Sequence, residues 1–349
     1  MKQKIRVALI YKKSYNFFQP NHHDKTTYDF FMKALKQDPN LEMMYFPADN
    51  RFDVSKLKGK CDIILLTSNR TDGTPNELVG IEKLEIPVIS RSGNSHYAKL
   101  PIRGERKNVP NLDGENIPVD YNTVQKNFHK KWKIDYYFGV LPKSYFYKYY
   151  PKEFRYQEII FGLEPELYQN LKPFNERIKD KILNTGVVGN KRLKSRIANK
   201  LLNPGFSGWK IYKLKTLCND LPYVHYEGMK DGKYPFSDNF PKYLSQYRAV
   251  IAACTVYPVQ KYWEMPAAGC LTFMEMTERN DGSYLGFKDG ETSIFINEKN
   301  YKKKFEEFLN DPENKKWQEI ACAGREHVMS NLNNEKAVES LVKLMRSLI

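Results

Sequence analysis

The stretch KYWEMPAAGCLTFME, which begins at Lys261, combines residue types that could bind a nucleoside diphosphate. Lys261 and Glu264 stand three positions apart on one face of an expected helix, and two alanines ending with Ala268 lead to Gly269, which would end that helix. A lysine at a helix N-terminus attracts phosphates, because the first backbone N–H groups also point toward the anion. The Glu264 carboxylate could accept hydrogen bonds from ribose hydroxyls. This spacing alone more often marks a solvated ion pair. The surrounding elements must therefore show whether the two residues form a binding site.

Several other chemistries have no motif in the sequence. GVVGNK, from residue 186, is not followed by the Lys-Ser or Lys-Thr pair of a Walker A phosphate loop, and no GxSxG, HExxH or EF-hand pattern occurs. The five cysteines are far apart and form no CxxC pair. This argues against a disulfide framework and a metal site, and it favours a reducing compartment.

The charge balance is strongly basic. Lysine and arginine number 56 against 41 acidic residues, a formal net charge of +15. Such a charge can attract nucleic acid, anionic lipid or phosphorylated substrates. An A/T-biased genome would also produce it, and the cations form no dense tail, so nucleic acid is a possible partner that is not favoured. Without a signal-peptide or membrane-span pattern, we expect a cytoplasmic protein, and peripheral contact with the inner membrane surface stays open.

Hydrophobic patterning predicts that alternating strands and helices carry these residues. In the first half, apolar runs typical of buried strands occupy residues 5–11, 41–46, 61–67, 86–90, 134–141 and 158–161. A helical pattern occupies residues 26–36. Strands separated by helices pair in parallel, which indicates a doubly wound α/β sheet. Residues 91–133 lose this periodicity and predict a long loop or an insertion at the rim of the sheet. Residues 162–180, rich in proline, glycine and charge, predict a hinge.

A second alternation follows the expected hinge. Strands are predicted at residues 181–188, 209–214, 223–226, 249–254, 271–274 and 293–296. Helices are predicted at residues 192–202, 240–247, 262–268, 301–309, 317–329 and 336–348. The helix at 192–202 is amphipathic, and its expected core-facing side holds Leu193, Ile197, Ala198, Leu201 and Leu202. The sequence therefore predicts two Rossmann-like α/β halves.

The order of motifs in the second half carries a resemblance. It begins with a strand, which is followed by the motif K/R-x-x-E and by two small residues and a glycine. A second strand with an acidic end comes next, and then LGFKDGE at residues 285–291. The opening strand brings Gly186 and Gly189, followed by Arg192 and Arg196, and FPKYLSQYRAVIAAC and AGREHVMSNLNNEKAVESLVKLM add further matches. This order resembles the donor-binding half of GT-B glycosyltransferases. It is most similar to group-1 enzymes whose C-terminal domain resembles spore-maturation (CgeB-like) proteins, and it covers roughly residues 181–348.

The resemblance implies a GT-B architecture. Residues 1–170 would form an acceptor domain, residues 171–312 a donor domain, and residues 313–349 would be helices that cross back to the first domain, with a cleft between the domains. It also implies a metal-independent, hexosyltransferase-like reaction with a nucleotide-diphosphate sugar, UDP- or GDP-sugar first, as co-substrate and no other cofactor. Positive groups would stabilise the leaving diphosphate. The donor-binding candidates are Lys261, Glu264, Arg192, Arg196, Gly186, Gly189, Tyr262, Ala268 and Gly269.

One departure from the pattern concerns the stereochemical outcome. Many retaining GT-B enzymes carry a second glutamate eight positions before the one on this helix, and here Val256 occupies that position. Retaining and inverting reactions therefore both stay open. An inverting transfer needs a general base, which loops at the carboxyl ends of the first domain's strands would supply. Asp24, after the first strand, and His96, after the strand at 86–90, are the catalytic candidates.

We therefore expect a glycosyltransferase that moves a sugar from a nucleotide sugar to a hydroxyl group of a glycan, lipid or other acceptor. Two alternatives stay open. The basic surface could serve a DNA-modifying glycosyltransferase. The missing upstream glutamate could instead mark a non-catalytic protein of the same fold that binds a nucleotide sugar or a polymer.

Overall fold

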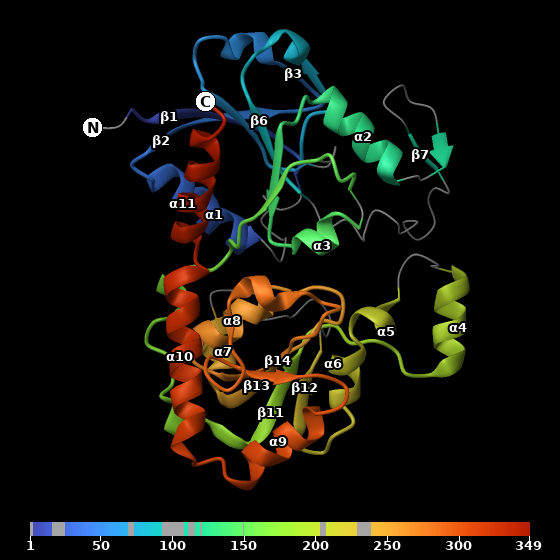
Figure 1. Cartoon of the computed structure of the whole chain (residues 1–349), viewed down its shortest axis with the longest axis vertical. Coiled ribbons are helices and arrows are strands. Elements are labelled where there is room, and N and C mark those ends of the chain that lie inside the picture. Colours follow the sequence, from blue (N-terminus) through green and yellow to red (C-terminus); the bar gives the residue numbers. More distant parts are fainter. Residues whose placement is uncertain are drawn as a thin grey trace. The chain divides into compact units, whose positions relative to one another are not determined.

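The structure is a computed structural model that describes residues 3–15, 25–68, 73–92, 108–110, 116–118, 121–148, 150–202, 207–228 and 239–349. The chain divides into two compact units (Figure 1). The first consists of Met1–Phe161 together with Asn334–Ile349, and the second of Gly162–Asn333.

The first unit is built on a parallel sheet of six strands in the order β10-β9-β6-β4-β1-β2. These strands are β1 (Ile5–Lys12), β2 (Leu41–Ala48), β4 (Ile63–Leu66), β6 (Val88–Arg91), β9 (Tyr136–Gly139) and β10 (Tyr156–Glu158). Alternate residues of β1 enter two separate hydrophobic clusters, Val7 and Leu9 one and Ala8 and Ile10 the other. The sheet is therefore buried on both faces, which explains why its strands read as unbroken apolar runs.

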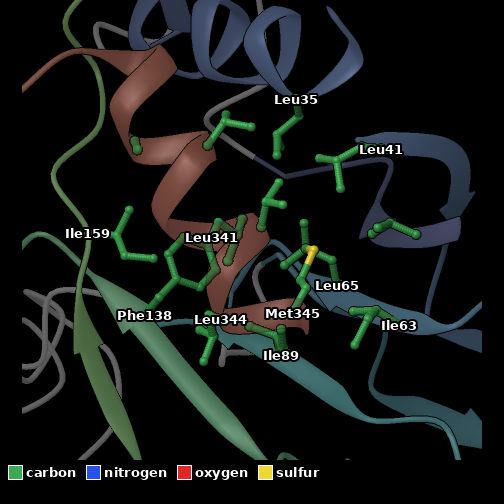
Figure 2. Packing of buried hydrophobic residues seen from close by; sticks show 14 of the residues in the cluster. Leu35, Leu41, Ile63, Leu65, Ile89, Phe138, Ile159, Leu341, Leu344 and Met345 are labelled. Carbon is green, nitrogen blue, oxygen red and sulfur yellow. The ribbon is translucent and has the colours of Figure 1, made fainter. Parts of the chain in front are cut away.

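Two helices from opposite ends of the chain share one of these clusters. They are α1 (Lys25–Gln37) and α11 (Asn334–Arg346). Figure 2 shows Leu341 and Met345 of α11 packed among Leu35 of α1 and Leu65 of β4. Because all four side chains are almost completely buried, the last helix of the chain completes the core of the first unit.

Shorter elements complete the first unit. The helices are α2 (Tyr121–Lys131) and α3 (Lys143–Phe146), the 3-10 turns η2 (Val54–Leu57) and η3 (Ile81–Lys83), and the short strand pairs β3 (Arg51–Asp53) with β5 (Glu77–Val79) and β7 (Asn108–Pro110) with β8 (Asn116–Pro118). The predicted loop at 91–133 is thus wrong in its last part, where α2 forms. Phe128 on α2 stacks at 4.7 Å on Trp132, which is fully buried, so tertiary packing fixes this helix.

The second unit has a parallel sheet of five strands in the order β12-β11-β13-β14-β15. They are β11 (Ile178–Thr185), β12 (Val224–Glu227), β13 (Tyr247–Ala252), β14 (Leu271–Glu275) and β15 (Ile294–Ile296). The turns and helices are η5 (Pro165–Tyr168), η6 (Phe174–Glu176), α4 (Leu193–Leu202), α5 (Gly208–Ile211), α6 (Lys213–Cys218), α7 (Phe240–Leu244), α8 (Lys261–Ala267), η7 (Gly282–Leu285), α9 (Tyr301–Asn310) and α10 (Lys315–Asn331). Helix α10 lies in this unit, whereas α11 belongs to the first. Two parallel sheets confirm the predicted α/β class.

Two predictions for the second unit are wrong. Residues 209–214 form no strand, because the Ser207 side chain caps α5 by accepting a hydrogen bond from the Lys210 N–H (3.3 Å) and α6 follows directly. Three of the five residues predicted for the apolar, core-facing side of the helix at 192–202 do not face the core either. Leu193 is 65% exposed and Ile197 is 53% exposed, and Ala198 is exposed too. Among the described residues, no helix is long and apolar enough to cross a membrane.

Candidate functional site

Buried polar residues lie at or just beyond the carboxyl ends of strands β11, β13 and β14, among them Thr185, Thr255 and Glu275. Ligands of open parallel α/β sheets bind at this edge. Lys261, the first residue of α8, reaches it, because its Nζ donates a hydrogen bond of 2.8 Å to the carbonyl oxygen of Thr185, the last residue of β11. Lys261 thus lies at a helix start, as expected from the sequence. The fold brings its ammonium group to the carboxyl end of β11.

A second lysine lies beside it that the sequence did not indicate. Lys215 on α6 is only 4% exposed, and its side chain interacts directly with that of Lys261. Burial, followed by the charge of Lys261, lowers the pKa of Lys215 well below its usual value. Burial also lowers the pKa of Lys261 to about 8, although the charge of Glu264 opposes this shift. Loss of solvent disfavours the charged form of both lysines, so the pair is suited to receive an anion, which would favour protonation of both.

The position of Lys215 is fixed by the backbone of its own helix. The buried Asn184 of β11 donates a hydrogen bond from Nδ2 to the Lys215 carbonyl oxygen (2.9 Å) and another to Asn219. The Lys215 Nζ also lies 5.6 Å from the centre of the Tyr212 ring, a cation–π contact. Among the residues that the structure describes, no carboxylate forms an ion pair with Lys215. These contacts position the Lys215 side chain at the strand end.

The two glycines that follow β11 shape the loop next to the lysines. Gly186 has a positive φ of 82°, which favours glycine, and its N–H donates to the Glu227 carbonyl oxygen (3.1 Å). Gly189 donates its N–H to the Thr216 hydroxyl (2.7 Å), and a Cβ at Gly189 would lie 2.6 Å from the Cα of Trp209. The backbone of α5 therefore approaches the loop too closely for any side chain at position 189.

This loop borders an open pocket of about 440 Å³. Its lining residues are Val188, Gly189, Asn190, Lys191, Arg192, Thr216 and Asn219. Of the two predicted arginines, Arg192 thus lines the pocket. Arg196 does not, and its guanidinium lies 4.5 Å from the centre of the Trp209 ring. The pocket brings Arg192 and Gly189 together in one wall.

The other predicted residues of α8 divide into two groups. Glu264 is partly exposed and acts on the charge of Lys261. Tyr262 is fully buried, and its hydroxyl accepts a hydrogen bond from the Cys254 N–H (3.1 Å) and donates one to the Glu275 carbonyl oxygen (2.9 Å). The Tyr262 hydroxyl therefore links the end of β14 to the segment that follows β13. It helps to fix the positions of these two strand ends.

Ala268 and Gly269 end α8, as the sequence predicted for the glycine. Ala268 is buried, and Gly269 takes a positive φ of 68°. The Gly269 carbonyl oxygen accepts a hydrogen bond of 2.7 Å from the guanidinium of Arg177, a buried residue. These contacts fix the helix end and leave Lys261 at the opposite end of α8.

Glu275, the last residue of β14, is a buried acid that the sequence analysis did not propose as a site residue. Burial raises its pKa to about 7, and the Thr255 hydroxyl donates a weak hydrogen bond to its Oε2 (3.4 Å). A carboxyl group with such a pKa holds a proton during part of its time near neutral pH. The sequence signal was an acid directly after an apolar run.

The two predicted catalytic residues, Asp24 and His96, lie outside the described residues. The carboxyl edge of the first unit's sheet nevertheless shows a polar cluster around Arg91, at the end of β6. Its Nε donates to the Thr67 carbonyl oxygen (2.8 Å) and its Nη2 to the Tyr15 hydroxyl (2.5 Å). The guanidinium also lies 5.0 Å from the Tyr28 ring centre. The described residues contain no group of three or more His, Cys, Asp or Glu that could hold a metal ion.

No protein-family model matches this sequence, and no curated protein matches it. Solved structures match over nearly the whole chain. Sucrose-phosphate synthase from Thermosynechococcus elongatus is 12% identical, with a TM-score of 0.55 over 99% of both chains. HepE from Anabaena, solved with UDP-glucose, is 10% identical, with a TM-score of 0.54 over 98% of this chain and 100% of its own.

An α-glucosyltransferase, solved with UDP-glucose and DNA containing an abasic site, is 9% identical, with a TM-score of 0.52 over 98% of this chain and 100% of its own. At these identities the likeness concerns the fold. The chain has the α/β fold with parallel sheets that GT-B glycosyltransferases have, and the resemblance inferred from the sequence is confirmed at this level.

Proposed function

We propose that the protein is a glycosyltransferase that moves a sugar from a nucleoside-diphosphate sugar to a hydroxyl group of an acceptor. The observation that carries the proposal is the contact between the buried Lys215 and the partly exposed Lys261 at the carboxyl edge of the second sheet. Two lysines whose charged forms are disfavoured by burial gain most from a ligand with more than one negative charge, which would favour protonation of both. A diphosphate is such a ligand, and HepE and the α-glucosyltransferase of similar fold were solved with UDP-glucose.

In the proposed reaction the bond between the anomeric carbon and the β-phosphate oxygen breaks, and its electron pair stays on that oxygen. The acceptor hydroxyl oxygen bonds to the sugar and loses its proton to a base, for which Asp24 and His96 remain our candidates. Lys215 and Lys261 would stabilise the charge that develops on the diphosphate, so that no metal ion is required. Arg192 would add charge from the pocket wall, and Glu264 would accept hydrogen bonds from the ribose.

The finer identity of the donor follows from the resemblance alone. We expect the donor to be a UDP- or GDP-sugar. We also expect the protein to be related to the group-1 enzymes with a CgeB-like C-terminal domain. Since the position eight residues before Glu264 is Val256, a reaction that depends on a second glutamate there is not part of the proposal.

The test compares the wild-type protein with Lys215→Met, Lys261→Met and the control Lys303→Met, an exposed lysine on α9. Titration calorimetry with UDP and GDP measures binding, and release of UDP or GDP from a panel of sugar nucleotides measures turnover. Each site variant should weaken diphosphate binding at least about tenfold, because a charge-assisted hydrogen bond contributes about 1.5–3 kcal/mol. Wild-type affinity in both variants would refute the site.

A DNA acceptor is the second candidate. It is favoured by the net charge of +15 and by the α-glucosyltransferase solved with DNA. Duplex binding that weakens steeply as salt increases, together with sugar transfer onto the duplex, would support it. Binding of UDP without any release from sugar nucleotides would instead indicate a non-catalytic binding protein.

A further inference from the structure

Helix α4 exposes two large apolar side chains, Leu193 and Ile197, to solvent. Leu193 and Ile197, one turn apart, are 65% and 53% exposed, and Val187 in the loop before the helix is 47% exposed. Ser195 on the same helix is more covered than either. Figure 1 shows α4 standing apart from the second unit's sheet. An ordinary surface helix turns such residues inward, so these side chains are available to an apolar partner.

The sequence around this helix is strongly basic, although Lys191 pairs with Asp220 and Lys213 with Glu298. From residue 181 to residue 219 the chain contains nine lysines and arginines and neither aspartate nor glutamate. On the helix itself Lys194 and Arg196 are exposed, and Arg192 is exposed just before it. The Arg196 guanidinium lies 4.5 Å from the ring centre of Trp209, which is itself partly exposed, so a contact with α5 supports the helix.

We infer that α4 is a docking surface for an anionic lipid bilayer. An exposed apolar stripe flanked by cations is the pattern of a helix that lies in the membrane interface. The cations are attracted to anionic headgroups, while Leu193 and Ile197 enter the acyl boundary. DNA would satisfy the cations and leave the two apolar side chains without a role, so the observations favour lipid. The inference stands whether or not the protein transfers a sugar.

The experiment uses the full chain and vesicles of phosphatidylcholine with and without phosphatidylglycerol, separated by sedimentation. The wild-type protein should bind the anionic vesicles, and the double variant Leu193→Ser, Ile197→Ser should bind at least about tenfold more weakly, because apolar burial is lost. Lys194→Gln should bind about fivefold more weakly, because one cation leaves the anionic surface.

The controls are Ile349→Ser, which removes an apolar side chain that is 61% exposed in the first unit, and Lys303→Gln on α9. Both should bind within about twofold of the wild-type protein, since neither residue belongs to the proposed surface. All variants are checked for unchanged thermal unfolding and UDP binding, which keeps this test separate from that of the proposed function.

Absence of binding by the wild-type protein would overturn the inference, as would undiminished binding by the serine double variant. A DNA duplex at equal phosphate concentration is the competing ligand. Tighter binding to DNA than to anionic vesicles, unaffected by the serine substitutions, would assign the surface to nucleic acid and refute the lipid proposal.

Discussion

Replacing Lys261 with methionine should stabilise the ligand-free protein while it weakens diphosphate binding. Burial lowers the pKa of Lys261 from 10.5 to about 8. Since one pKa unit corresponds to about 1.4 kcal/mol, holding the proton at neutral pH costs about 3 kcal/mol. Methionine fills a similar volume without charge but leaves the Thr185 carbonyl oxygen without the lysine donor, which costs about 1 kcal/mol. The expected net gain is about 2 kcal/mol, a rise in Tm of about 4–8 °C for a unit of this size.

The pH dependence has a definite sign. Because the folded-state pKa lies below the unfolded value, the folded protein releases its proton first as the pH rises. The free energy of unfolding of the wild-type protein should therefore increase between about pH 8 and pH 10.5. The advantage of Lys261→Met should be complete below about pH 8 and disappear once the lysine is neutral in both states.

Differential scanning calorimetry at neutral and at high pH, with and without UDP, measures these effects. UDP should raise the Tm of the wild-type protein more than that of Lys261→Met, because the bound diphosphate restores the proton affinity of the lysine. Lys303→Met should behave as the wild-type protein does. If Lys261→Met lowered the Tm equally at both pH values, the lysine would be an ordinary stabilising contact and the argument for an anion site would fail.

Three further predictions concern other residues. Leu341→Ala should lower the free energy of unfolding by about 2–5 kcal/mol, because it leaves a cavity in the first unit's core; an unchanged urea midpoint would contradict this. Glu275→Gln should stabilise the protein near pH 8 and not near pH 4.5. Because the pKa of Glu275 is raised from 4.5 to about 7, the free energy of unfolding of the wild-type protein falls as the pH rises between these two values. Calorimetry at both pH values measures the difference. Gly189→Ala should weaken UDP binding and lower the Tm, because its Cβ would lie 2.6 Å from the Trp209 backbone. Gly208→Ala should be tolerated, because its Cβ would lie 3.8 Å from the nearest atom. Equal effects of the two substitutions would contradict this prediction.

The buried central strands of the two large sheets could be predicted because burial on both faces leaves a continuous apolar run, as in β4 and β13. Helix α8 could be predicted to within one residue at each end, since the positive φ that ends it at Gly269 is a local property of glycine. Short amphipathic segments could not. Residues 209–214 look like a strand, and only the capping Ser207 and the helices that follow distinguish them.

Burial of single side chains was the other failure. Lys215 lies in a segment for which no element was predicted, and only the packing of α6 at the strand ends buries its side chain. Leu193 and Ile197 show the opposite error, because their helical spacing is typical of a core face although both are exposed. Spacing along a helix defines a common face, whereas the tertiary fold decides what that face meets.

The discontinuous first unit has a consequence for biosynthesis. Its core lacks Leu341 and Met345 until the ribosome has added α11, whereas the second unit, Gly162–Asn333, is an unbroken segment that emerges earlier. Domains usually fold from the N-terminal end during synthesis. Here the order should be reversed, and the second unit should reach its native state first. The hydrophobic core of the first unit stays partly exposed until α11 has been synthesised. A stop codon just before residue 334 would therefore leave an aggregation-prone N-terminal half attached to a folded second unit.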